Sequence, residues 1–201
     1  MNRKLTTICV TFLLILSCER DANHVSSKKI DEEMQITRKI ELHDNRNIQK
    51  NNEANFYINQ GRYGEAELKY REIIDESPNE YIAYHGLGSA SYYQGNYEKS
   101  RTYYYKALNL NPDFADSYIG LGAIELTLEN YNIALDYQNR ALKLDPEYAG
   151  AYYARATTYK KLGKTDQAIL DLKKVIKLAK NTDLAMRANN RLRKYVTKQA
   201  N

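Results

Sequence analysis

The sequence predicts an all-α fold: an α-α superhelix of about four helix pairs that ends in a C-terminal capping helix. The first observation behind this prediction is the even spacing of the only three prolines, Pro78, Pro112 and Pro146, since 112 − 78 and 146 − 112 both equal 34. A fixed period of this length is typical of proteins that stack one small unit on the next. The second is composition, because 43% hydrophobic residues with only 9 glycines suit a folded helical chain.

Other residues recur at the same offset and fix the register of the repeat. Gly86-Leu87-Gly88 is followed by Gly120-Leu121-Gly122 at the same place in the next unit. Because several residue types agree in register, the period does not depend on the prolines alone. The other matched sets are Tyr84, Tyr118 and Tyr152; Tyr63, Tyr97 and Tyr131; and Ala66, Ser100, Ala134 and Ala168.

Each unit contains two amphipathic segments joined by a short polar turn, which predicts a helix pair. Pro112 and Pro146 end the second helix of their units, because proline lacks an amide donor and disfavours helix at the preceding residue. Tyr70 and Tyr104 are expected to fill the space between units, and Gln138 breaks that series. The predicted turns are residues 60–62, 94–96, 129–130 and 162–164.

Small side chains are predicted to face each other within each pair. They let two helices approach to the close end of the usual separation of about 8 to 10 Å. On the first helices these residues are Ala54, Gly88, Gly122 and Ala156, and on the second helices they are Ala66, Ser100, Ala134 and Ala168.

The order of aromatic, Leu-Gly, aromatic, small residue, aromatic and closing proline resembles the tetratricopeptide repeat (TPR) family, which forms solenoids. The resemblance covers residues 47–182. The first unit lacks the Leu-Gly pair, and the fourth has Arg155-Ala156 in its place and no proline, as terminal repeats are commonly irregular. The repeats are 47–80, 81–114, 115–148 and 149–182.

The segments beside the repeats have a different character. Residues 183–201 are predicted to form a basic, Arg-rich capping helix. Residues 18–46 are predicted to be a polar tether with a short helix over 31–42, because their apolar residues lack a regular helical spacing.

Residues 1–17 are predicted to be a lipoprotein signal peptide. Arg3 and Lys4 precede an apolar run that is too short for the roughly 20 residues that cross a bilayer. Ile15-Leu16-Ser17-Cys18 resembles the lipobox of bacterial lipoproteins, although Leu16 is bulkier than the usual residue there. The resemblance implies that Cys18 carries fatty acyl chains such as palmitate and anchors the protein on the periplasmic or cell-surface side of a bacterial envelope. The alternative is an ordinary signal peptide cut near Ser17, with Cys18 a free thiol.

No constellation in the sequence indicates an enzyme. Cys9 lies in the segment that is removed, so Cys18 has no partner for a disulfide or a metal site. His24, His43 and His85 have no ligand or catalytic partner at useful spacing, and the Gly-x-Gly pairs lie inside predicted helices. We therefore expect no catalysis, no cofactor and no metal.

Charge divides unevenly along the chain. Residues 18–159 hold 16 basic and 22 acidic residues, whereas residues 160–201 hold 12 basic and 3 acidic ones. A basic end could follow phosphates of nucleic acid or lie on anionic lipid headgroups. Export argues against nucleic acid, so we expect no nucleic-acid partner and a solvated basic cap.

The TPR resemblance implies a concave groove, lined by the first helices, that binds a protein or peptide partner. Some TPR proteins grip a terminal carboxylate there, but Gly86, Gly120, Gly150 and Ala154 occupy several of the corresponding places, so that clamp is not expected. Tyr92 and Tyr93 are adjacent, so one of them could instead belong to the core. The implied groove residues are Asn55, His85, Ser89, Tyr92, Tyr93, Ile119, Ala123, Leu126, Tyr153, Thr157 and Lys160.

Two functions follow as expectations. The first is a membrane-anchored scaffold or adaptor that binds a protein or peptide in the cell envelope. The second is a self-associating component, a homo-oligomer, of an envelope assembly of the pilus or outer-membrane biogenesis type. Fold-level analogy supports only this general plan.

Overall fold

The computed structural model describes residues 27–199, which form helices and no strand. The predicted all-α superhelical fold is confirmed. The chain divides into two compact units, residues 1–47 and 48–201, and helix α2 (Ser27–Asn59) has residues in both. In the first unit, the described side chains of residues 33–42 are exposed to solvent.

Helix α2 is longer than the short helix predicted over residues 31–42. Its sequence is poor in regular apolar spacing, and it was this spacing on which the prediction depended. However, no glycine or proline interrupts residues 27–59, and Glu, Lys, Gln and Arg favour helix at exposed positions. The intrinsic helix propensity of these residues therefore makes α2 longer than the hydrophobic pattern predicts.

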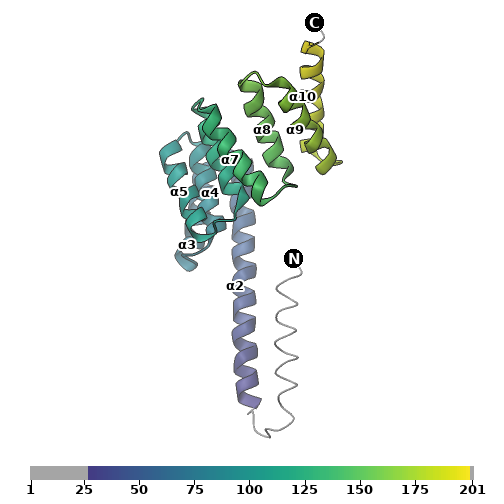
Figure 1. Cartoon of the computed structure of the whole chain (residues 1–201). Coiled ribbons are helices and arrows are strands. Elements are labelled where there is room, and N and C mark those ends of the chain that lie inside the picture. Colours follow the sequence, from purple (N-terminus) through teal and green to yellow (C-terminus); the bar gives the residue numbers. More distant parts are fainter. Residues whose placement is uncertain (1–26, 200–201) are drawn as a thin grey trace. The chain divides into compact units, whose positions relative to one another are not determined.

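The second unit contains the helix pairs, which Figure 1 shows stacked one after another. In each pair a turn joins two antiparallel helices, and from α3 to α9 each helix has 13 or 14 residues. The helices after α2 are α3 (Tyr63–Glu76), α4 (Tyr81–Tyr93), α5 (Tyr97–Leu110), α6 (Ala115–Thr127), α7 (Tyr131–Leu144), α8 (Ala149–Lys161), α9 (Thr165–Leu178) and α10 (Asp183–Gln199).

The turns inside the pairs need a left-handed backbone residue at one place. Gly61, Gly95 and Gly163 supply it, with φ between 73° and 78°. Glu129 takes the same place in the third pair with φ 63°, a conformation that costs a residue with a Cβ about 1 to 2 kcal/mol. The same left-handed turn therefore forms at this repeat position even where the residue is not glycine.

The second helices end just before the prolines, as predicted. Helices α5 and α7 stop at Leu110 and Leu144, immediately before Asn111-Pro112 and Asp145-Pro146. The side chain of Asp145 then accepts a hydrogen bond of 2.9 Å from the amide of Glu147. The loop between repeats is thus closed by local hydrogen bonding as well as by proline.

Small residues bring the paired helices together. The hydroxyl of Ser100 donates a 2.7 Å hydrogen bond to the carbonyl of Gly88, across α4 and α5. A Cβ on Gly122 would lie 3.3 Å from the carbonyl oxygen of Ala134, so α6 and α7 also approach closely. The predicted contact between small side chains is confirmed at these two pairs.

Tyrosines fill the space between neighbouring repeats. Tyr70 and Tyr104 are 2% and 3% exposed, as expected for core positions. Gln138 occupies the same place one repeat later and is fully buried, where its Nε2 donates a 2.9 Å hydrogen bond to Thr158 Oγ1. The polar break in the series is therefore accommodated by a polar partner across the repeat boundary.

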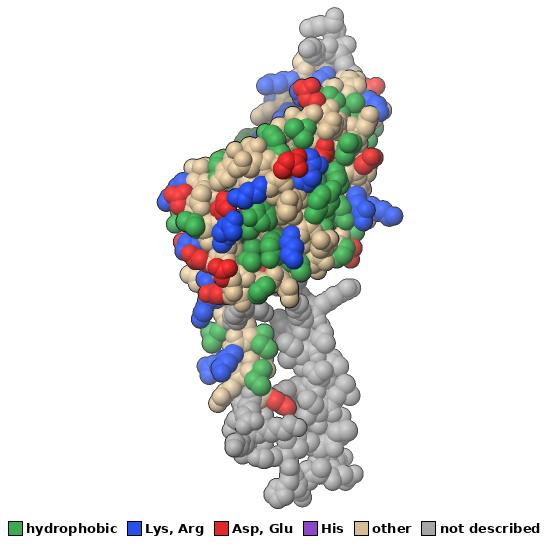
Figure 2. Space-filling view, turned by 90° about the vertical axis from the view of Figure 1, so that its left-hand side faces the viewer, with side chains coloured by type: hydrophobic (Ala, Val, Ile, Leu, Met, Phe, Trp, Pro, Cys, Tyr) green, Lys and Arg blue, Asp and Glu red, His purple; other side chains and the backbone are tan. Residues whose placement is uncertain are grey.

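The surface of the stack is mixed in character. Figure 2 shows hydrophobic side chains in patches between basic and acidic ones over one face of the repeats. None of the helices in residues 27–199 has both the length and the hydropathy required to span a bilayer.

Candidate partner-binding site

A hollow of about 200 Å³ lies between α4 and α6, the first helices of the second and third repeats. Its size is below the roughly 300 Å³ at which pockets for small-molecule ligands begin, and suits one large side chain of a partner. Six of the residues predicted for the groove line it: His85, Ser89, Tyr92, Tyr93, Ile119 and Ala123. The other four are Tyr104 of α5, Asp116 and Gly120 of α6, and Tyr148 in the loop before α8.

The depth of the hollow comes from Gly120 and Tyr104. A Cβ on Gly120 would overlap the ring of Tyr104, so the two residues fit only because position 120 carries no side chain. The Tyr104 hydroxyl lies 3.2 Å from Ser89 Oγ, and burial raises the pKa of Tyr104 to about 12. The hollow therefore has an uncharged, hydrogen-bonded tyrosine in its wall.

His85 gives the hollow a neutral polar group. Its Nδ1 lies 3.2 Å from Ser117 Oγ, and its ring packs 5.2 Å from the ring of Tyr104. Burial lowers the pKa of His85 to about 4, against the opposing effect of the Asp116 carboxylate. At neutral pH the imidazole is therefore uncharged and has one donor and one acceptor nitrogen.

Asp116, near the start of the third repeat, and Tyr148, at its end, meet at one end of the hollow. The Tyr148 hydroxyl donates a hydrogen bond to the Asp116 carboxylate. Burial, followed by this hydrogen bond, raises the pKa of Tyr148 above its ordinary value. The carboxylate keeps its negative charge, but one of its oxygens is already occupied by the Tyr148 hydroxyl.

Aromatic rings form the other rim. The Tyr92 hydroxyl lies 2.9 Å from Thr127 Oγ1, and Tyr92 also packs against the core. Tyr93 is 56% exposed and stacks on Tyr63 at 5.3 Å. Both tyrosines therefore border the hollow, and Tyr92 also contributes to the core.

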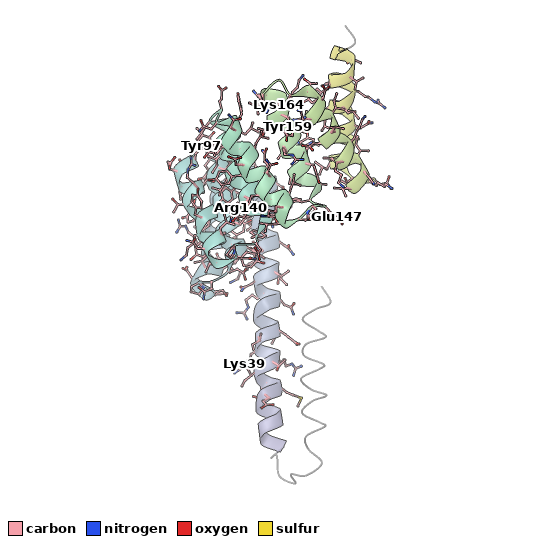
Figure 3. All side chains as sticks on the ribbon, in the orientation of Figure 1. Lys39, Tyr97, Arg140, Glu147, Tyr159 and Lys164 are labelled. Atoms are coloured by element: carbon pink, nitrogen blue, oxygen red, sulfur yellow. The ribbon has the colours of Figure 1, made fainter. Side chains whose placement is uncertain are left out.

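The end of the hollow formed by Asp116 and Tyr148 and its aromatic rim lie at opposite edges of the repeats. Figure 3 shows Tyr97, next to the turn inside the second repeat, at the same edge as Lys164, whereas Glu147 in a loop between repeats lies at the opposite edge. The Tyr92 ring is 5.8 Å from the Tyr97 ring, which places the aromatic rim near the turns inside the repeats.

Models described as "Tetratricopeptide repeat" match residues 79–147 and 137–170. Residues 79–170 are tetratricopeptide repeats. The TPR fold is that of a protein-interaction scaffold. A comparison with curated proteins gave no match.

Solved TPR structures share the fold of this chain. MamA is 22% identical, with a TM-score of 0.52, over 73% of this chain and 94% of that one. A thermophilic TPR protein of Thermus thermophilus is 21% identical, with a TM-score of 0.62, over 68% and 76%. The first TPR of Spaghetti (RPAP3), solved with the HSP90 peptide SRMEEVD, is 24% identical, with a TM-score of 0.56, over 60% and 96%.

Three predicted groove residues of the fourth TPR lie against α10 rather than in the hollow. The Tyr153 ring is covered by Arg187 and Arg191, whose guanidinium carbons lie 5.3 and 4.7 Å from its centroid. Arg191 Nη1 also donates a 2.7 Å hydrogen bond to Thr157 Oγ1. Lys160 Nζ lies 4.8 Å from the ring of Tyr195.

Helix α10 therefore stands where the first helix of a fifth TPR would stand. Arg187 and Arg191 follow Tyr153 and Thr157 by 34 residues, the period of the repeats. The sequence predicted a solvated cap here and missed this role, although continuing the 34-residue offset by one step would have found it.

The remaining predicted groove residues lie elsewhere on the TPR stack. The side-chain oxygen of Asn55 accepts a 2.7 Å hydrogen bond from the Tyr70 hydroxyl. Leu126 is partly buried in α6. The predicted lipidation site, Cys18, lies outside the described residues. Within residues 27–199, no group of three or more His, Cys, Asp or Glu side chains is arranged to hold a metal ion.

Proposed function

We propose that this TPR protein is a membrane-anchored scaffold that binds a peptide or protein partner in the groove of its first helices, within the cell envelope. The observation that carries the proposal is the hollow between α4 and α6, where small residues give depth and tyrosines form the rim. Tyrosine is enriched among the residues that contribute most to binding at protein interfaces. The Spaghetti TPR complex with a peptide supports the same use of a related fold.

A photo-crosslinking experiment tests groove binding in the full chain. A photoreactive amino acid at Ala123, which lines the hollow, should give an adduct with a partner protein in cells. The same amino acid at Asn132, an exposed residue of α7 outside the hollow, is the matched control and should give none. Equal adducts at both positions, or none at Ala123, would contradict groove binding.

Membrane anchoring is supported by the first 18 residues, which combine Arg3 and Lys4, an apolar run and Cys18. We expect Cys18→Ala to release the protein from the membrane fraction and to abolish labelling by palmitate. The physical reason is that the acyl chains would supply the anchoring energy, about 0.8 kcal/mol for each buried CH₂. Labelling that persists in the variant would contradict lipidation at Cys18.

Self-association in an envelope assembly is the second candidate. The observation that favours it is a set of apolar side chains left open on the second helices, with Leu68 and Leu170 exposed by 62% and 64%. Light scattering of the mature protein at rising concentration tests this candidate. A constant monomer mass would reject it and leave the partner-binding scaffold.

A further inference from the structure

The two halves of the groove differ in chemistry. The hollow between α4 and α6 is lined by neutral His85, by tyrosines and by the small Ala123, and its one carboxylate is bonded by Tyr148. On the wall formed by α8 and α10, three cations lie over tyrosine rings: Lys160 over Tyr195, and Arg187 and Arg191 over Tyr153. Asp183, the one acidic residue of α10, lies one helical turn before Arg187.

The cations at the centre of this wall are held in place. Arg187 and Arg191 lie over the same ring, that of Tyr153, and Arg191 is also fixed by its hydrogen bond to Thr157. Stacking on an aromatic ring leaves the edge of a guanidinium, where its N–H donors lie, open to an anion. The pair is therefore preorganised to receive carboxylates.

These two arginines lack an internal counter-charge. Arg101 and Arg155 each form an ion pair with a buried carboxylate, Glu125 and Asp171 respectively. In the part of the chain that the structure describes, neither Arg187 nor Arg191 forms an ion pair with a carboxylate. The wall therefore has positive charge that a partner can neutralise.

We propose that the partner is an extended acidic peptide segment: one large apolar or aromatic side chain enters the hollow, and two neighbouring Asp or Glu side chains contact Arg187 and Arg191. This inference rests on the proposed function and specifies the chemistry of the partner. It differs from capture of a terminal carboxylate, because the cations belong to α10, beyond the fourth repeat.

The geometry fixes the spacing between the two anchors. The hollow lies between α4 and α6, and the basic wall lies between α8 and α10, which is two helix positions further along the groove. Neighbouring helices pack about 8 to 10 Å apart, so the anchors are about 16 to 20 Å apart. An extended chain covers about 3.3 to 3.6 Å per residue, so about five or six residues separate the anchors in the peptide.

Fluorescence titration with synthetic peptides tests the inference on the mature full-length chain. The probes are twelve-residue peptides with one Phe and a Glu pair placed two, six or nine residues away, and matched peptides in which Gln replaces Glu. We expect the six-residue spacing to bind best, with at least about a thirtyfold advantage over its Gln counterpart, as for loss of an interface anchor. Its affinity should fall with added salt.

Matched variants separate this inference from the proposed function. Arg187→Glu with Arg191→Glu should abolish the advantage of Glu over Gln and favour a peptide with a Lys pair instead. Lys173→Glu with Lys177→Glu, exposed on α9, is the charge-matched control and should change little. Ala123→Arg should weaken every peptide that uses the hollow.

Three outcomes would overturn the inference. If Glu and Gln peptides bind equally but Ala123→Arg weakens both, the acidic specificity is wrong and groove binding survives. If no peptide binding depends on Ala123, groove binding fails as well. If the Arg187 and Arg191 variant loses binding to phosphatidylglycerol vesicles or to RNA while peptides never bind, the basic wall serves a different class of partner.

Discussion

A tyrosine of one repeat and a small residue of the next are matched in size. Tyr70 meets Gly86, and Tyr104 meets Gly120, at points where a Cβ would overlap the ring. One and two periods later the tyrosine is replaced by Gln138 and Leu172, and the glycine by Ala154 and Ala188. A slimmer side chain on one side thus coincides with an added methyl group on the other, as close packing requires.

This matching predicts a coupled pair of substitutions. Gly120→Ala should lower the free energy of unfolding by about 1 to 3 kcal/mol, because the new Cβ overpacks against Tyr104. Tyr104→Leu with Gly120→Ala recreates the Leu172 and Ala188 pair and should lose less than the sum of the single losses. Urea denaturation of the four proteins of the cycle measures this.

Gly64→Ala is the control for that cycle. Position 64 lies in α3, where an added Cβ would meet nothing within 4 Å. This variant should be more stable by about 0.5 to 1 kcal/mol, because alanine favours helix over glycine. Simple additivity of the Tyr104 and Gly120 changes would show that the two residues do not share a contact.

His85 predicts how stability depends on pH. Its pKa in the folded protein is about 4, while its ordinary value is about 6.5. Between these values the unfolded chain binds a proton that the folded chain does not, so stability is full above pH of about 6.5 and falls as pH drops toward about 4. Urea denaturation should show a smaller loss across this window for His85→Gln than for the parent. An identical loss would place the histidine in an open, solvated environment.

At the scale of helices, the sequence predicted the repeat units but not their two ends. The offset of 34 located the turns, the helix stops before the prolines and the tyrosines between repeats, because packing imposes these residues at every step. The full length of helix α2 was not predicted, because an exposed helix needs no regular spacing of apolar residues. Six of the residues that line the hollow follow from the repeat pattern, whereas Asp116 and Tyr148 meet only through tertiary structure.

The irregular fourth repeat contains a buried ion pair at the two positions where the second and third repeats carry leucine and tyrosine; at the same positions the first repeat has Glu53 and Lys69, 3.7 Å apart. Arg155 takes the place of Leu121, and Nε and Nη2 of its guanidinium each bond the carboxylate of Asp171 at 2.8 Å. Asp171 is 5% exposed, so its charge depends on this partner. The departure from Leu-Gly is therefore a paired exchange of residues on α8 and α9 rather than a defect.

Breaking this pair should destabilise the protein more than replacing it. Asp171→Ala should cost about 3 to 5 kcal/mol, because it leaves the arginine partly buried without its counter-charge. Arg155→Leu with Asp171→Tyr restores the residues found one period earlier, Leu121 and Tyr137, and should recover most of that loss. Thermal and urea denaturation of both variants distinguish the two effects. A double variant less stable than Asp171→Ala would mean that the ion pair is needed for packing as such.

For the whole molecule, stability is shared along the stack and α10 has two tasks. Each repeat contacts mainly its neighbours, so an end repeat needs a cover for its apolar face. Ala188, Leu192 and Tyr195 of α10 provide this cover over Leu172 and Val175 of α9. On the adjacent face of α10, Arg187 and Arg191 lie over Tyr153 of α8, so the same helix covers the core and, in the proposed function, extends the groove.

Removing residues 183–201 should therefore unfold the stack from its C-terminal end. The truncation exposes Leu172 and Val175 and removes Leu192 and Tyr195, which pack against the same cluster. Each large apolar side chain contributes about 1.5 to 3 kcal/mol to the free energy of unfolding when it is fully buried. Hydrogen exchange should show protection falling first in α8 and α9, while α4 to α6 keep theirs, because interactions pass only between adjacent repeats. Removing residues 198–201 alone spares the packed residues and should change neither exchange nor melting temperature. Unchanged protection of α9 in the longer truncation would mean that the fourth repeat is stable without its cover, and α10 would then serve the groove alone.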